Sequence, residues 1–430
     1  MDASELYKTS PPELGRSARK YFGFDPQYTN LNNGSYGSPP LPVLAACNSL
    51  SNEAESNPDL FIRLTCRPLL KRVRQQVADL VGAHVDECVM VTNASLGLNT
   101  ILWNFEWERQ DIIIAFNTTY SSISKTIQYL SDRPPHPSIV EFTVLFPTTH
   151  ADIIARFRDF VRQLPRPAEG EPKRKVVAVI DSIISNPGVL LPWKELVTVC
   201  REEGVWSVID AAHSIGQEQD LDLSSAKPDF WVSNCHKWLF AKRGCAVLYV
   251  PFRNQHIIKT SIPTSYLYTS PASGKPPVFG EQFERNGAID YVPFLSVSHA
   301  LEFRAWLGGE QRINEYCHKV ALEGGRRLAE ILGTTVLDPD GSLTLNMVDV
   351  ELPLSTEIQP SWELVAVLQQ KLIQEHKIYA GHHFHNGKWW TRCSTQVYND
   401  LNDFETLGKV WPIVCKEVEL EFEHKARAEH

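Results

Sequence analysis

Three short segments of the sequence carry side chains whose types and positions suit chemistry. Lys237 lies in the segment SNCHKW, directly after an apolar run. Asp210 ends the run WSVID, and the small polar stretch TNASLG at 92–97 follows the run VMV. Singly, each has an ordinary explanation: a lysine whose stem lies on apolar surface, an aspartate that caps a helix, and a polar loop. A charged lysine or aspartate at the end of a buried strand is nevertheless costly without a partner.

Together, the three segments predict a single site for pyridoxal phosphate (PLP). Small polar residues that open a helix expose backbone N–H groups at the positive end of the helix dipole, which suits a phosphate. A lysine supplies the Schiff base, and an aspartate pairs with the protonated pyridine nitrogen so that the ring withdraws electrons. The interval between Asp210 and Lys237 leaves room for one crossover and one further strand. Both residues would then lie at the carboxyl ends of neighbouring strands, where open α/β sheets bind ligands.

The elements that must position these residues are short apolar runs separated by helical stretches. The runs are continuous rather than alternating, which is typical of strands covered on both faces. The expected strands are at 89–91, 111–116, 175–181, 206–210, 230–234 and 246–250. The expected helices between them are at 122–130, 151–164 and 193–203. This order predicts an α/β fold whose large domain holds a mostly parallel sheet of about seven strands.

The second half of the chain has a different pattern of predicted helices and strands. A long helix is expected at about 296–332, with a break at Gly308-Gly309. From about 333 onward, the strand pattern TLNMVDVEL and the helix pattern SWELVAVLQQKLIQEH alternate. This part therefore predicts a small α+β domain at the C-terminus.

The composition excludes several classes of protein. The 430 residues carry 42 Lys and Arg against 51 Asp and Glu, a net charge of −9 that argues against a nucleic-acid partner. Hydrophobic residues make up 43%, enough for a large core. No apolar stretch approaches the roughly 20 residues that a membrane span needs, and the N-terminus lacks a secretory signal pattern. We therefore expect no membrane partner.

The cysteines and a histidine-rich segment point to neither a disulfide framework nor a metal. The nine cysteines are odd in number and form no CxxC pair, which favours reduced thiols and a cytoplasmic location. His382, His383 and His385 lie close together in the sequence. No acidic or cysteine residue stands at ligand spacing beside them, so we expect no metal site.

Six segments between Leu31 and Glu405 resemble a known family of enzymes. They are LNNGSYGSPP, VTNASLGLNT, SNPGVLLP, SNCHKWLFAKRGCAVLYVP, RNQHIIKTSIPTS and RCSTQVYNDLNDFE. In these segments the chain resembles the fold-type-I PLP enzymes of the class V aminotransferase and cysteine desulfurase superfamily. Within it, the chain is similar to the isopenicillin N epimerase-like branch, and there to fungal hercynylcysteine sulfoxide lyases of ergothioneine biosynthesis. The segment HKWL with the upstream VID is the most specific part of the resemblance.

The resemblance implies a domain organisation and an assembly. The PLP-transferase fold of type I would comprise an N-terminal segment 1–45 over the active site, a large PLP-binding domain 46–295, and a linking helix with the small C-terminal domain 296–430. Enzymes of this family act on amino-acid substrates. They are homodimers whose active sites lie at the subunit interface.

The resemblance also implies roles for individual residues. The implied catalytic residues are Lys237, Tyr120, Asp210 and His213. The implied cofactor-binding residues are Asn93, Ala94, Ser95, Ser185, Asp210, His213, Ser233, His236 and Lys237. The implied substrate-binding residues are Arg392, Asn33, Tyr36 and Arg63, with Arg392 holding the α-carboxylate through its guanidinium. Three of these have simpler alternatives: a core tyrosine at Tyr120, a satisfied polar residue at His213, and a surface ion pair at Arg63.

Two positions depart from the pattern of the family. Relatives usually read Asn-His-Gly-Ser-Phe-Gly near the start, whereas this chain has Asn33 in place of the histidine. An amide cannot exchange a proton as an imidazole can. Relatives also carry Gly-Thr in the segment that reaches the neighbouring subunit's phosphate, whereas this chain has Gly287-Ala288. Both departures weaken the transfer of substrate identity.

Three functions are compatible with this pattern. The first is β-elimination at the C–S bond of an S-substituted cysteine through a carbanion at Cα, with Tyr120 passing a proton to the leaving group. The second is formation of a C–C bond at the α-carbon, as in PLP enzymes of fungal alkaloid pathways in the same branch. The third is a relative that binds PLP without catalysis.

Overall fold

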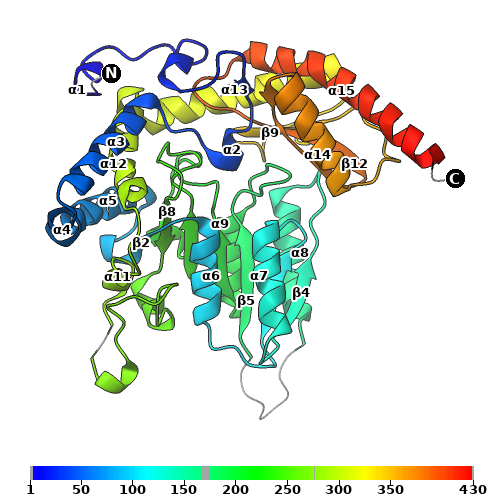
Figure 1. Ribbon diagram of the computed structural model, residues 1–430. Coiled ribbons are helices and arrows are strands. Elements are labelled where there is room, and N and C mark those ends of the chain that lie inside the picture. The colour runs from blue at the N-terminus through cyan, green and yellow to red at the C-terminus, as the bar shows by residue number, and fades with distance from the viewer. Residues whose placement is uncertain (1–2, 166–173, 276, 429–430) are drawn as a thin grey trace.

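The computed structural model describes residues 3–165, 174–275 and 277–428. They form a large domain built on one sheet and a smaller domain beside it (Figure 1). Among the described residues, no helix has both the length and the apolar character needed to cross a membrane.

The large domain is built on a seven-stranded sheet in the order β2-β8-β7-β6-β5-β3-β4. Six strands run parallel, and β8 runs antiparallel to both of its neighbours. The strands are β2 (Cys88–Val91), β3 (Ile112–Phe116), β4 (Ser138–Phe142), β5 (Val176–Asp181), β6 (Trp206–Asp210), β7 (Phe230–Ser233) and β8 (Ala246–Tyr249). Six of them lie within one residue of the predicted ends, and the predicted fold class is confirmed. The sequence pattern missed β4, an edge strand whose side chains are mostly exposed.

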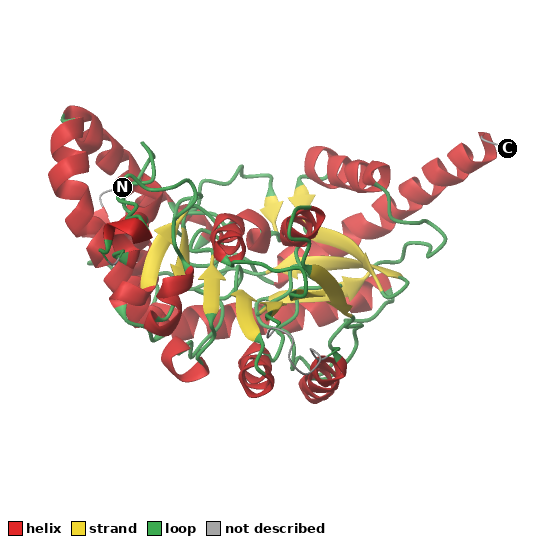
Figure 2. Ribbon diagram, turned by 90° about the horizontal axis from the view of Figure 1, so that it is seen from below, coloured by secondary structure: helices red, strands yellow, loops and turns green. Residues whose placement is uncertain are grey.

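Helices cover both faces of this sheet, as Figure 2 shows from below. On β3, Ile112 and Ile114 belong to a core shared with α5, α8, α9 and α12. Ile113, which points to the other face, belongs to a core shared with α6 and α7. This double burial explains why the strands read as continuous apolar runs. These helices are α5 (Cys66–Val81), α6 (Ala94–Asn104), α7 (Ser121–Asp132), α8 (His150–Gln163), α9 (Trp193–Glu203) and α12 (Val292–Trp306).

The smaller domain follows a broken helix, as expected. Helices α12 and α13 (Gly309–Leu332) are separated at Gly308, whose φ of 108° lies in the left-handed region that glycine tolerates. The domain holds an antiparallel sheet in the order β11-β12-β9 with its own apolar core. Its elements are β9 (Met347–Glu351), α14 (Trp362–Gln370), β10 (Ile378–Tyr379), β11 (Gly381–His385), β12 (Lys388–Ser394) and α15 (Leu401–Ala428).

The N-terminal segment is joined to this smaller domain through its backbone. Strand β1 (Thr29–Asn30) pairs in parallel with β10, and Asn32 forms a β-bridge with Ser394. The chain then turns through α2 (Asn33–Tyr36) toward the loop that carries Lys237. There Gly37 approaches so closely that a Cβ atom on it would lie 1.7 Å from the His236 carbonyl oxygen. Only glycine fits this position, because its φ of 64° is also left-handed.

Candidate active site

The carboxyl ends of β5, β6 and β7 bring the central residues of the site together. Asp181 ends β5 and Asp210 ends β6, and the two are direct neighbours in the register of the parallel strands. Lys237 lies in the turn that follows β7. The predicted placement of Asp210 and Lys237 at adjacent strand ends is therefore what the sheet shows.

The Lys237 amine lies beside a histidine whose tautomer is fixed by a neighbour. Lys237 Nζ is 3.0 Å from His213 Nε2, and the Trp238 indole N–H donates to His213 Nδ1 at 3.2 Å. Since an indole nitrogen only donates, Nδ1 is the acceptor and Nε2 carries the proton of the neutral ring. Burial, and then the charge of Lys237, hold the pKa of His213 well below its usual range. An Nε2–H favours an unprotonated amine opposite it.

Burial also lowers the pKa of Lys237 to about 8, against the opposing influence of Asp210. A lysine whose pKa lies near physiological pH is partly unprotonated, and the unprotonated amine is a nucleophile and a base. An ordinary lysine is almost entirely protonated at this pH. Burial thus increases the fraction of Lys237 in the unprotonated form that Schiff-base chemistry requires.

The two aspartates form a buried carboxylate pair with few partners. Both are only 3% exposed. Asp210 Oδ1 accepts the Ala212 N–H at 3.1 Å, and Asp181 Oδ2 accepts no hydrogen bond from the described residues. Burial raises the pKa of Asp210 to about 6, and burial together with the Asp210 charge raises that of Asp181 well above its usual range. The charge of Lys237 only partly offsets this burial, and Asp181 Oδ2 still lacks a donor among the described residues, which a protonated pyridine nitrogen would supply.

The start of α6 is the candidate phosphate cradle. Asn93 caps the helix, because its side chain accepts the Leu96 N–H at 2.8 Å. The Ala94 N–H donates to the Asn234 side chain at 2.9 Å, which ties this cradle to the turn before Lys237. The Ser95 hydroxyl has no partner among the described residues and remains free for a phosphate oxygen. The group of donors, with the carboxylate pair and Lys237, fits PLP.

Arg392 enters the site from the middle of β12. It is 2% exposed, and its two terminal nitrogens donate to neutral oxygens only. Gly381 lies opposite it on β11 and, lacking a side chain, leaves room for the guanidinium. The acceptors are the Ser185 carbonyl and hydroxyl, the Asn186 and Asn32 side chains, and the Ser35 hydroxyl. A cation that faces only neutral acceptors can still bind a carboxylate.

A third buried carboxylate stands behind Arg392. Asp349 is paired with Arg392 across β9 and β12, and its Oδ2 accepts the Gly188 N–H at 2.7 Å. Its Oδ1 accepts no hydrogen bond from the described part of the chain and lies 3.7 Å from His383 Nε2. Burial raises the pKa of Asp349 to about 7. Burial lowers the pKa of Arg392, and the ionised form of Asp349 acts against this effect.

Asn33 lies in the site but faces the protein. It is 1% exposed, its Nδ2 donates to the Lys237 carbonyl at 3.1 Å, and its Oδ1 accepts the Tyr398 hydroxyl at 3.2 Å. This amide therefore joins the N-terminal segment, the Lys237 turn and the C-terminal domain. Its substrate-binding role stays a prediction.

Two other predicted residues are likewise occupied by the protein. The Ser233 hydroxyl donates to the Ala211 carbonyl at 2.5 Å and accepts the Ile215 N–H. His236 Nδ1 lies 2.8 Å from the Cys245 carbonyl oxygen, and burial lowers the pKa of His236 to about 4. Both side chains shape the turns around His213 and Lys237.

Three further predicted residues lie on the surface of the single chain. Tyr36 is 69% exposed and Tyr120, which precedes α7, is 47% exposed. Arg63 pairs with Asp59 at 2.7 Å on the surface, which is the alternative that the sequence left open. Their roles in a site remain predictions. Among the described residues, no group of three or more His, Cys, Asp or Glu side chains is arranged to hold a metal ion.

Several residues of the site escaped the sequence reasoning. They are Asn32, Ser35, Asp181, Asn234 and Asp349. Asp181 ends the apolar run VVAVID just as Asp210 ends WSVID, so its signal was present in the sequence. The others lie in polar loops or in the smaller domain, where the sequence pattern carries no comparable sign.

This arrangement defines a PLP-dependent enzyme of fold type I, and comparisons with known proteins agree. The family model "Aminotransferase class-V" matches residues 39–261. The chain is 35% identical to the L-cysteine desulfhydrase-like protein lolT1 of Epichloe uncinata, over 94% of this chain and 96% of that protein. It is 31% identical to hercynylcysteine sulfoxide lyase of Schizosaccharomyces pombe, over 93% of this chain and 98% of the lyase.

A solved structure supports the fold. A C-DES mutant with glycine covalently linked to its PLP cofactor superposes with a TM-score of 0.73 at 19% identity, covering 91% of this chain and 98% of that one. The chain belongs to the class V aminotransferase family, and its cofactor is PLP.

Proposed function

We propose that this chain is a PLP-dependent lyase that cleaves the C–S bond of an S-substituted cysteine by β-elimination. The observation that carries the proposal is the combination, in one site, of the buried Lys237 amine beside His213 and the buried Arg392 guanidinium. The names of two relatives, which match this chain over more than nine tenths of its length, support the same chemistry on sulfur.

Arg392 would hold the α-carboxylate of the substrate. Its acceptors Asn32, Ser35 and Ser185 are neutral, so an incoming carboxylate would gain a charge-assisted, two-pronged interaction that they do not provide. Because Asn32 and Ser35 belong to the N-terminal segment, that segment would rearrange its hydrogen bonds when the substrate enters.

Lys237 would then remove the proton from Cα. When bound, PLP supplies an electron-withdrawing ring that stabilises negative charge at that carbon. The Asp181–Asp210 pair would hold the proton on the pyridine nitrogen, which keeps the ring electron-withdrawing. His213, neutral and donating through Nε2, would leave Lys237 free to take the proton.

The electrons left at Cα would form a Cα–Cβ double bond as the Cβ–S bond breaks. The sulfur would leave with the bonding pair and take a proton, for which Tyr120 is the predicted donor. Release and hydrolysis of the three-carbon fragment consume one water and yield pyruvate and ammonia. The balance is one S-substituted cysteine and one water giving one thiol, one pyruvate and one ammonia.

The test is to mix the holoenzyme with S-methyl-L-cysteine and with its sulfoxide and to measure pyruvate and the sulfur product. Equal amounts of both products are expected. Exchange of the Cα hydrogen with deuterium, no pyruvate, and a new product only when an aldehyde is added would replace the proposal with C–C bond formation. No exchange with any amino acid tested would favour a relative without catalysis.

A further inference from the structure

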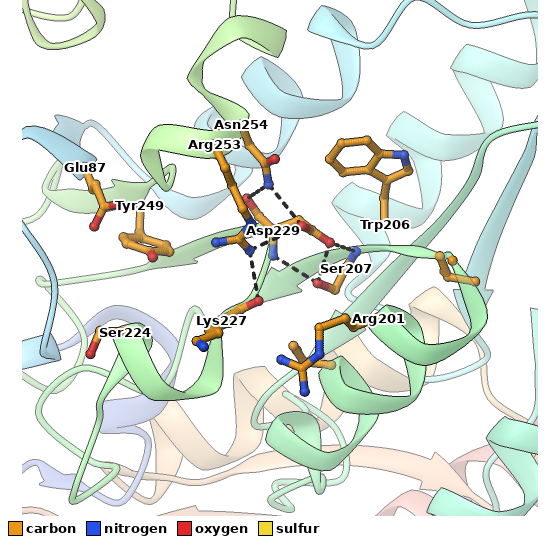
Figure 3. A pocket seen from close by; sticks show the side chains of 13 residues that line it. Glu87, Arg201, Trp206, Ser207, Ser224, Lys227, Asp229, Tyr249, Arg253 and Asn254 are labelled. Atoms are coloured by element: carbon orange, nitrogen blue, oxygen red, sulfur yellow. Dashed lines mark hydrogen bonds and ion pairs between the residues drawn. The ribbon is translucent and has the colours of Figure 1, made fainter.

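A cavity lies at the end of the sheet where β6 begins, away from Lys237, and Figure 3 shows it from close by. It is lined at the start of β6 by Trp206 and Ser207, and at the end of the antiparallel β8 by Tyr249. Its volume is about 760 Å³, within the range of small-molecule sites. Because β6 ends at Asp210, the whole length of the strand separates this cavity from the candidate PLP site.

The acidic side chains that line the cavity have more hydrogen-bond and ion-pair partners than two of its basic side chains. Its two acidic side chains have protein partners: Asp229 accepts from Ser207 and Asn254, and Glu87 accepts the Phe252 N–H at 3.0 Å. Asp229 is also 3.3 Å from the Arg253 guanidinium. These contacts hold Asp229 in the floor of the cavity (Figure 3).

Two cations at the cavity have almost no partners. Arg201, at the end of α9, makes one long hydrogen bond of 3.4 Å to the Thr198 hydroxyl. The Lys227 amine makes no hydrogen bond or ion pair with a described residue, although its carbonyl accepts from Arg253. The neighbouring acids on α9, Glu202 and Glu203, pair instead with Arg158 and Arg162. On a chain of net charge −9, this is a local excess of positive charge.

Two aromatic side chains give the cavity a rigid wall. Trp206 packs against Phe105 and Phe230, with ring centroids 5.8 and 6.4 Å apart, and it also lines the cavity. Tyr249 is 2% exposed and borders the same space. Fixed aromatic rings beside unpaired cations suit a ligand that combines a planar ring with a multiply charged anion.

From these observations we propose that the cavity is a binding site for a small phosphate ester of a planar ring compound, separate from the PLP site. Arg201 and Lys227 bind the phosphate, and Trp206 borders the ring. Arg253 keeps the floor in place through its contacts with Asp229 and with the carbonyls of Lys227 and Pro228.

The test uses holoenzyme whose PLP site is filled, so that the PLP phosphate cradle is not available to the probe. Adenosine 5′-monophosphate is titrated by isothermal calorimetry, and one site per chain is expected. Adenosine, which lacks the phosphate, and inorganic phosphate, which lacks the ring, are each expected to bind at least tenfold more weakly. Equal binding of inorganic phosphate and the nucleotide would overturn the part played by the ring.

The variant Arg201→Ala/Lys227→Ala removes the two unpaired cations and is expected to weaken nucleotide binding at least tenfold. The variant Arg109→Ala/Lys125→Ala removes the same charge from exposed positions elsewhere and should bind as the unchanged protein does. Both variants should keep the melting temperature of the holoenzyme, because all four residues are exposed. Absence of nucleotide binding to the unchanged protein, or equal binding in the two variants, would overturn the proposal.

Discussion

Two kinds of buried carboxylate lie at opposite ends of the strands of the large sheet. Asp111, just before β3, is fully buried and saturated: it accepts the backbone N–H groups of Lys175 and Glu108 and pairs with the Lys175 amine at 2.9 Å. Asp181 and Asp210, at the carboxyl ends of their strands, are also buried, but among the described residues Asp210 Oδ1 accepts one backbone N–H and Asp181 Oδ2 accepts none.

The difference between these carboxylates separates a structural role from a functional one. A carboxylate whose oxygens are all hydrogen-bonded or ion-paired holds a loop and strands together. A buried pair with few donors can instead bind an added positive group. We call the amino ends of the strands, near Asp111, the stable edge, and the carboxyl ends, near Asp181 and Asp210, the reactive edge. Substitutions at the stable edge should change the free energy of unfolding, and substitutions at the reactive edge should change turnover.

The largest effect is expected for Lys237→Ala at the reactive edge. It removes the amine that we propose forms the Schiff base and takes the Cα proton, so the proposed lyase turnover should fall on the order of 10³-fold or more. The visible absorbance of the protein-bound Schiff base should disappear as well. Lys125→Ala, which removes an exposed lysine from α7, is the control. A borohydride-reducible bond between PLP and the Lys237→Ala protein would contradict the assignment.

Asp111→Ala at the stable edge should lower stability and leave the chemistry intact. The change removes two backbone hydrogen bonds and an ion pair from a buried position, at a cost of about 3 kcal/mol in the free energy of unfolding. Urea unfolding of the PLP-free protein measures this loss. The turnover per folded molecule should not change, and a selective loss of turnover would remove the distinction between the edges.

Asp210→Asn should act in the opposite direction on stability. The folded protein keeps a proton on Asp210 up to about pH 6, whereas the unfolded chain loses it near pH 4, so ionising the pair lowers stability as the pH rises through this range. At pH 7 the substitution should therefore stabilise the PLP-free protein by about 2 kcal/mol and lose this advantage below pH 4. Turnover should fall, because an amide cannot hold the pyridine proton. Equal destabilisation of the Asp210→Asn and Asp111→Ala proteins would contradict the comparison.

Arg392→Lys tests whether the buried cation of the smaller domain, whose hydrogen-bond acceptors are neutral, binds the substrate. A lysine keeps the charge but loses the two-pronged geometry, so KM should rise about tenfold to a hundredfold with a smaller change in kcat. Arg63→Lys changes the surface pair with Asp59 and is the matched control. A similar rise in KM for Arg63→Lys would place Arg63 in the site after all.

The smallest effect is expected for Trp238→Phe, which removes the donor that fixes the His213 tautomer. His213 Nε2 could then carry no proton and accept a hydrogen bond from the protonated Lys237 amine, which should raise the pKa of the lysine above its value of about 8. The pH dependence of Schiff-base formation with added PLP measures this shift. Trp231→Phe removes another buried indole N–H, one without a partner among the described residues, and should leave the profile unchanged.

The sequence predicted the reactive edge better than the rest of the site, for a physical reason. Strands covered on both faces are apolar throughout, so a lysine or aspartate at their ends is conspicuous, as at Asp210 and Lys237. Strand β4 lies at the edge of the sheet and is largely exposed, so it lacked that contrast. Long C-terminal helix α15 likewise went unpredicted, and Pro412 interrupts its pattern.

The partners of Arg392 were hidden for another reason. Asn32 and Ser35 are about 360 positions away along the chain, and small polar residues in a loop carry no periodic signal. Such contacts depend on how the two domains and the N-terminal segment meet, which local patterns do not encode. The domain boundaries and the homodimer stay predictions.

The pairing of β1 with β10 delays the folding of the N-terminal segment during synthesis of the chain. Thr29 leaves the ribosome early, yet its partner Ile378 is synthesised near the end. At about 5–20 residues per second, the N-terminal segment waits roughly 20–70 s for that partner. During this interval the Asn32 and Ser35 side chains cannot contact Arg392. The large domain can complete its sheet in the meantime, so the substrate side of the site is the last part to be assembled.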